Sequence, residues 1–121
     1  MPVRSLHSSV LKWPDARTVD AAVRAWAAQL ASAHPEVLKV GYWGSYARGD
    51  WGVGSDVDLV LILSRSDLPF DQRGRTLDAT SLPVPADLLV YTLEEWLNLP
   101  EEGRFKKTLA SEIVWVFERN P

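Results

Sequence analysis

Two aspartates open the most apolar segment of the chain, Asp56-Val57-Asp58-Leu59-Val60-Leu61-Ile62-Leu63. Side chains alternate along a β-strand, so Asp56 and Asp58 would share one face, with Cα atoms about 6.6 Å apart. Two ionised carboxylates on one face repel each other. Solvation in a loop before the strand, a shared proton, or a divalent cation would relieve that repulsion. Mg²⁺ is such a cation, because it binds carboxylates together with substrate phosphates.

A glycine-serine turn lies upstream, in the segment Gly44-Ser45-Tyr46-Ala47-Arg48-Gly49. It follows a predicted strand and begins a short helix, whose first N–H groups can bind an anion such as phosphate. Gly44 would let a ligand approach the backbone closely, or serve only the turn. Ser45 could instead be a plain N-cap. For Arg48 we favour an anchoring ion pair, with a carboxylate such as Asp50, over a phosphate contact.

A third acidic residue, Asp87, lies within the apolar segment Val84 to Tyr91. If this segment is a strand beside Asp56 to Leu63, Asp87 can face the first two carboxylates. Three carboxylates can hold one or two divalent ions, and two ions stabilise both oxygens of an in-line phosphoryl displacement. We then expect a raised pKa for at least one of the three. Alternatively, Asp87 points into water from an edge strand, a position that Pro85 favours.

The elements that must position these residues follow from periodicity. Thr18 to Ala33 has apolar residues on one helical face, and Pro35 ends this helix. We expect it to cover a β-sheet and to bury Trp26 and Leu30, with Leu59, Leu61 and Leu63 in the core. The remaining predicted elements are strands at Val37 to Trp43 and Ile113 to Phe117, and helices at Phe70 to Asp78, Leu93 to Leu99 and Glu101 to Ser111.

Composition limits the class of protein. The 121 residues carry a formal charge of -3 and no cysteine, which excludes a disulfide scaffold and argues against stable nucleic-acid binding. No apolar run approaches the ~20 residues of a membrane span. Residues 1–10 lack the pattern of a signal peptide. We expect one cytoplasmic domain over residues 1–121, of the α/β (α+β) class, with a small mixed sheet of three to five strands and helices packed on one face.

The order G-S-Y-A-R-G, five residues, S-D-V-D-L-V, then an aspartate in a later apolar strand resembles the DNA polymerase β-like nucleotidyltransferase superfamily. It is most similar to the minimal nucleotidyltransferases, small prokaryotic proteins often encoded beside a HEPN protein. The resemblance covers roughly Val37 to Tyr91 and implies the nucleotidyltransferase fold.

The resemblance also implies a role for each residue of the motif. Gly44 and Ser45 would contact the triphosphate. Asp56 and Asp58 would be ligands of two Mg²⁺ ions, and Asp87 would complete one metal site and help to deprotonate the acceptor. The implied reaction is attack of a hydroxyl on the α-phosphate of ATP or a related nucleotide, with pyrophosphate leaving.

The acceptor is expected to come from outside the domain, because only Leu93 to Pro121 follow the motif. It would be a protein, or be held by a partner or by a second copy of this chain. In the minimal nucleotidyltransferases the implied acceptor is a tyrosine of the HEPN toxin, so the chain would be an antitoxin. The alternative is a non-catalytic module that neutralises a partner by occlusion, which exposed tryptophans and tyrosines would favour. By default, Arg65, Arg73 and Arg75 are solvated, and Tyr46 and Trp51 serve packing.

Overall fold

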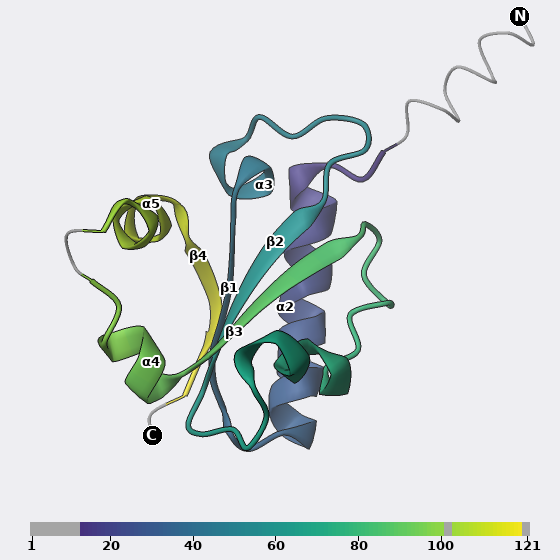
Figure 1. The fold of residues 1–121 in the computed structure, drawn as a ribbon. Helices are drawn as coiled ribbons and strands as arrows, with labels where there is room; N and C mark the ends of the chain where they lie inside the picture. The colour runs from purple at the N-terminus through teal and green to yellow at the C-terminus, as the bar shows by residue number, and fades with distance from the viewer. Residues whose placement is uncertain (1–12, 101–102, 120–121) are drawn as a thin grey trace, which may run out of the picture.

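The computed structural model describes residues 13–100 and 103–119, which form a four-stranded sheet in the order β3-β2-β1-β4 (Figure 1). β2 pairs antiparallel with β1 and parallel with β3, and β1 pairs antiparallel with β4. The predicted mixed α/β class is therefore confirmed. The strands are β1 (Val37–Trp43), β2 (Val57–Leu63), β3 (Ala86–Thr92) and β4 (Val114–Glu118). The helices are α2 (Ala16–Ala33), α3 (Ser45–Arg48), the 3₁₀ helix η1 (Phe70–Thr76), α4 (Leu93–Leu97) and α5 (Arg104–Glu112).

Helix α2 covers one face of the sheet (Figure 1). It begins two residues before the predicted start, because Asp15 is its N-cap and accepts a hydrogen bond from the Thr18 N–H at 2.8 Å. Trp26 and Leu30 are buried, as predicted. The Trp26 indole N–H also donates to the backbone carbonyl of Asp78 at 2.7 Å, which ties the helix to the loop before β3.

Strand β2 is the centre of the core. Leu59, Leu61 and Leu63 are buried beneath α2, as predicted. Val60 and Ile62, which alternate with them and point to the other face, are fully buried as well. Only the start of β2 is open to solvent, and this is where the aspartates lie.

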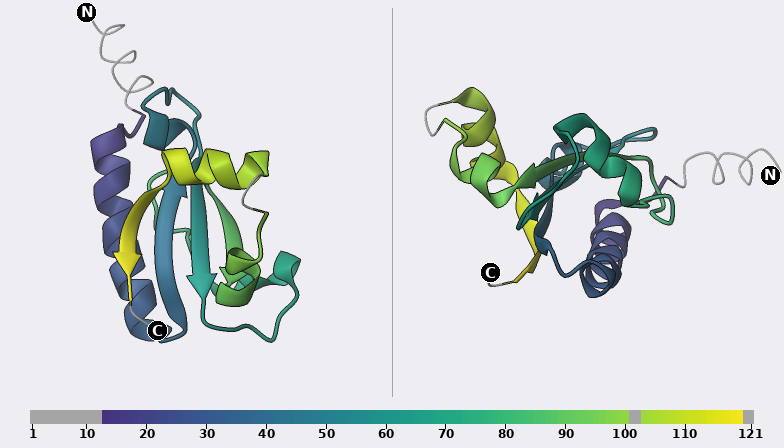
Figure 2. Two further views of the ribbon diagram at one scale, coloured as in Figure 1. Left: turned by 90° about the vertical axis from the view of Figure 1, so that its left-hand side faces the viewer. Right: turned by 60° about the horizontal axis from the view of Figure 1, so that its bottom comes forward.

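Helices α4 and α5 lie across the sheet from α2 (Figure 2), so the prediction that the helices pack on one face was wrong in this detail. The reason is a second apolar layer made largely of aromatic rings. Trp96 contacts Trp115 with ring centroids 5.9 Å apart, and Phe105 contacts Trp43 at 6.1 Å. This layer buries the outer face of the sheet, including Ile62.

Arg73 was expected to be solvated and is instead buried. Its guanidinium donates to the backbone carbonyls of Leu68 at 2.9 Å and Val90 at 3.1 Å, and it pairs with both carboxylate oxygens of Glu95. Glu95 also forms a capping box with Thr92 at the start of α4. The hydrogen bonds from Arg73 lower the pKa of Glu95 to about 2. Arg65 and Arg75 are exposed, as expected.

We expect Glu95→Gln to destabilise the fold at neutral pH. The folded pKa of Glu95 lies below its ordinary value of 4.5, so its stabilisation is complete above pH 4.5 and is lost as the pH falls toward 2. The loss should be only about 1 kcal/mol, since 41% of the Glu95 side chain is exposed and solvent screens the pair. Urea unfolding at pH 7, 5 and 3 measures this loss of stability. The control variant is Glu94→Gln, at the exposed neighbouring residue. A deficit that stays constant from pH 7 to pH 3 would contradict the role of this ion pair.

No helix within residues 13–100 and 103–119 is long and apolar enough to cross a membrane.

Candidate active site

Gly44 follows the last residue of β1 and is the N-cap of α3. Its φ of 83° and ψ of −151° belong to a backbone region that residues other than glycine rarely adopt. A Cβ atom at this position would lie 2.3 Å from the Oδ2 atom of Asp58. Two features therefore each require glycine at position 44: the backbone conformation, and the close approach of the Asp58 carboxylate.

Ser45 is the first residue of α3, so the alternative that it is the N-cap was wrong. Its side chain is half-buried beside Gly44. Among the residues that the structure describes, its hydroxyl has no hydrogen-bond partner and can donate to a ligand.

Asp58 and Asp87 are partners in the register of the parallel strands β2 and β3. Neighbouring strands lie about 4.8 Å apart, and in-register partners point to the same face, so these two side chains are adjacent. Asp58 is half-buried and Asp87 is exposed. Asp56 is exposed as well and lies one residue before β2, which begins at Val57 and not at Asp56 as predicted.

The pKa of Asp58 is raised above its ordinary value of 3.8. Burial is the largest cause, followed by the negative charges of Asp87 and Asp56, while the positive charge of Arg48 acts in the opposite direction. The predicted raised pKa is confirmed, although burial contributes more to it than the repulsion on which the prediction was based. The negative charges of Asp56 and Asp87 thus both act on Asp58.

Arg48 anchors the turn, as we expected from the sequence. Its Nε donates to the Asp50 carboxylate at 3.2 Å. Its Nη1 also lies 3.3 Å from both carboxylate oxygens of Glu112, the last residue of α5. The Gly44 N–H donates to Glu112 Oε2 at 3.4 Å. Sequence analysis missed Glu112, because nothing in the α5 sequence indicates a contact with a turn more than 60 residues away.

Tyr46 and Trp51 serve packing, as expected. The Tyr46 ring is buried and stacks on Trp51, with centroids 5.6 Å apart and an interplanar angle of 8°. The Tyr46 hydroxyl donates to the backbone carbonyl of Pro14 at 2.9 Å. These contacts hold α3 and the loop that follows it against the start of α2.

The donor chemistry of the site suits Mg²⁺. In the part of the chain that the structure describes, no three His, Cys, Asp or Glu side chains lie close enough together to hold a metal ion by themselves. Mg²⁺ does not need a complete protein cage, since one or two carboxylates commonly hold it while water and substrate phosphates fill the other positions. Asp58 and Asp87 provide such a pair of oxygen donors, whereas the predicted grouping of all three aspartates around one metal ion is not found within the described residues.

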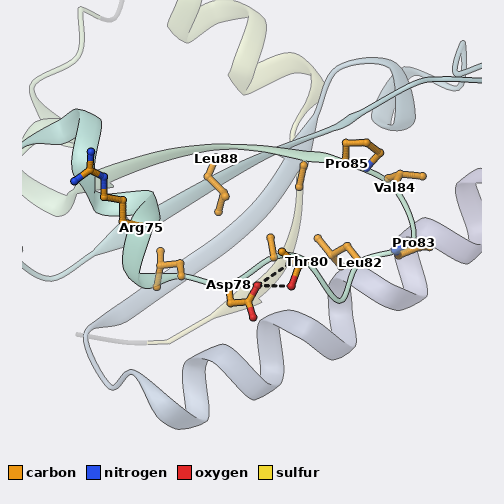
Figure 3. A pocket seen from close by; sticks show the side chains of 11 residues that line it. Arg75, Asp78, Thr80, Leu82, Pro83, Val84, Pro85 and Leu88 are labelled. Atoms are coloured by element: carbon orange, nitrogen blue, oxygen red, sulfur yellow. Dashed lines mark hydrogen bonds between the residues drawn. The ribbon is translucent and has the colours of Figure 1, made fainter.

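A hollow of about 730 Å³ lies elsewhere, between β3 and the loop that precedes it (Figure 3). Ala86 and Leu88 line it, and they alternate with Asp87, whose side chain therefore points away from it. The carboxylate of Asp78 at its rim is already bonded to Thr80, with distances of 2.9 Å and 2.6 Å. This hollow is therefore separate from the acidic site.

The fold and the site together define a class: a small mixed α/β domain that presents carboxylates from two neighbouring strands beside a glycine-serine turn. Residues 23–116 match the family model of the nucleotidyltransferase domain. The chain belongs to this family. No curated protein matches the chain significantly.

Solved structures share this fold. A protein from Sulfolobus solfataricus classed as a nucleotidyltransferase is 18% identical, with a TM-score of 0.62 over 86% of this chain and 84% of that chain. A toxin–antitoxin complex with AMP-PNP is 14% identical, with a TM-score of 0.56 over 80% and 74% of the two chains. A variant of the toxin–antitoxin pair MntA–HpeT is 11% identical, with a TM-score of 0.53 over the same shares, 80% and 74%. At these identities the likeness establishes the fold alone.

Proposed function

We propose that this chain is a Mg²⁺-dependent nucleotidyltransferase that transfers a nucleoside monophosphate, AMP from ATP, to a hydroxyl group. The observation that carries the proposal is the in-register pair Asp58 and Asp87, next to a glycine that Asp58 approaches too closely for any other residue. The family match and the raised pKa of Asp58 support it.

Each residue then has a chemical role. Asp56, Asp58 and Asp87 would hold Mg²⁺, which supplies positive charge for the phosphate oxygens when it is bound. The Gly44 N–H and the Ser45 hydroxyl bind and orient the triphosphate. Asp87, the more exposed member of the strand pair, accepts the proton of the attacking hydroxyl. Such transfers depend mainly on positioning and charge neutralisation.

We further propose that the acceptor is a tyrosine of a HEPN-family toxin and that the chain acts as the antitoxin. Two structures with the same fold are toxin–antitoxin complexes, and one of them contains AMP-PNP, an ATP analogue. The MntA–HpeT variant replaces two aspartates separated by one residue, which is the spacing of Asp56 and Asp58 here.

The transfer assay combines the purified chain, Mg²⁺, ATP labelled at the α-phosphate and the protein encoded beside its gene. We expect label on a tyrosine of that partner, and none when EDTA removes the metal. Labelling that persists with EDTA, or no labelling of the partner or of a second copy of this chain, would contradict the proposal.

Occlusion of a partner without catalysis is the second candidate function. Large apolar side chains on the α4 and α5 side favour it, since Phe105 is 40% exposed and Leu97 is 65% exposed. The double variant Asp56→Asn with Asp58→Asn separates the two functions. If this folded variant still suppresses the toxicity of the partner, occlusion is the function, whereas loss of suppression supports catalysis.

A further inference from the structure

The carboxylate of Glu112 contacts two residues of the candidate active site, Gly44 and Arg48. Its Oε2 atom accepts a hydrogen bond from the Gly44 N–H at 3.4 Å, and both of its oxygens lie 3.3 Å from Nη1 of Arg48. Only 18% of its side chain is exposed. Its negative charge also contributes to the raised pKa of Asp58. Glu112 therefore adds a fourth carboxylate to the aspartate site.

This position conflicts with nucleotide binding. The Gly44 N–H is the donor that the proposed function gives to the triphosphate, and one N–H cannot serve two anions at full strength. A carboxylate beside the three aspartates also repels an incoming polyphosphate. Arg48, a cation within this turn, is already paired with Glu112 and Asp50.

We propose that Glu112 is an internal competitor of the nucleotide: it closes the phosphate site of the empty protein and must leave when a triphosphate binds. The inference rests on the proposed function. Displacement of Glu112 frees the Gly44 N–H, and it frees Arg48 to pair with a phosphate group. The net free energy of nucleotide binding is then the interaction free energy of the phosphates with these donors minus that of the Glu112 carboxylate, which they displace.

The movement that this requires is small. Leu109, one turn before Glu112, is fully buried, and Phe105 packs edge-on against Trp43. These two contacts hold α5 on the sheet. Glu112 is the last residue of α5, next to the C-cap Ile113, where rotation of one side chain leaves the packed residues in place. We therefore assign the opening to the Glu112 side chain and not to α5 as a whole.

Calorimetric titration with Mg²⁺ and AMP-PNP tests this inference. We expect Glu112→Gln to bind the analogue about tenfold more tightly than the unmodified chain, because the competing charge is gone. Glu112→Asp should also bind it more tightly, since the shorter side chain cannot reach Gly44. The control is Glu118→Gln, an exposed residue of β4, which should not change the affinity. Circular dichroism confirms that each variant is folded.

The opposite result is clear. If Glu112 holds metal or only supports the structure, both variants bind AMP-PNP as weakly as the unmodified chain or more weakly, and the inference is wrong. Titration with Mg²⁺ and tripolyphosphate separates this failure from that of the proposed function. If Glu112→Gln binds tripolyphosphate more tightly but does not bind AMP-PNP, then Glu112 does compete with a polyphosphate, and the proposal that the substrate is a nucleotide is wrong. No binding of either anion by the variant would overturn both.

Discussion

Asp58→Asn should abolish nucleotidyl transfer while leaving the protein at least as stable as before. Asp58 is the half-buried member of the carboxylate pair, and under the proposed function its loss removes a metal ligand at the reacting phosphate. We expect a loss on the order of 10³-fold in the rate of transfer. The stability should change in the opposite direction, because burial and neighbouring charges raise the pKa of Asp58 and so disfavour its ionised form in the folded state.

The sign of this stability change depends on pH. An acid whose folded pKa is raised destabilises the fold above that pKa, and the penalty vanishes below its ordinary value of 3.8, where both states are protonated. The gain in Asp58→Asn should therefore be seen at pH 7 and disappear toward pH 3. Urea unfolding and the labelled-ATP assay measure the two effects, with Asp67→Asn at an exposed position as the control. Normal transfer by the variant would contradict the role of Asp58 as a metal ligand, whereas lower stability at pH 7 would show that Asp58 has a structural role.

Gly44→Ala should lose both activity and stability. The φ of 83° with a ψ of −151° costs roughly 1–3 kcal/mol for a residue with a Cβ. The added Cβ would also lie 2.3 Å from Asp58 Oδ2, so the carboxylate must move. Because a displacement of about 1 Å can cost 10²-fold in rate, we expect at least that loss in transfer.

Gly49→Ala is the matched control for this prediction. Gly49 also has a positive φ, 91°, but a Cβ there would meet nothing within 4 Å. Its backbone lies in the left-handed helical region, so we expect Gly49→Ala to lose roughly 1–2 kcal/mol of stability and to keep most of its transfer activity. If Gly44→Ala and Gly49→Ala have equal rates of transfer, the contact between Gly44 and Asp58 is unimportant for the chemistry.

Local sequence patterns predicted the frame of the site well. The strand from Val37 to Trp43 has the predicted bounds, because Pro35 and Gly44 limit it on both sides. The apolar residues around Asp58 and Asp87 predicted two strands that could pair side by side. The register confirms the pairing, and β3 lies at the edge of the sheet, the position that Pro85 indicated. The bounds of β3 were less accurate: it begins at Ala86, directly after Pro85, which cannot donate a ladder hydrogen bond.

Contacts between distant segments could not be predicted in this way. Glu112 meets Gly44 because α5 crosses the outer face of the sheet. Arg73 is buried because Glu95 at the start of α4 and two backbone carbonyls accept its hydrogen bonds. The short helices contain too few residues for their hydrophobic periodicity to predict which face is buried. The abundance of aromatic residues, six tryptophans in 121 residues, suggested an exposed aromatic surface, but none of the six tryptophans is exposed. Trp96 and Trp115 help to form a second apolar layer.

Crystals grown with Mn²⁺ and AMP-PNP test the central claim most directly. Mn²⁺ takes the same oxygen ligands as Mg²⁺ and is located by its anomalous scattering. We predict a Mn²⁺ peak about 2.2 Å from carboxylate oxygens of both Asp58 and Asp87, with the triphosphate against the Gly44 N–H in place of Glu112. A metal bound away from these two aspartates, or a triphosphate seated elsewhere while Glu112 stays on Gly44, would contradict the account.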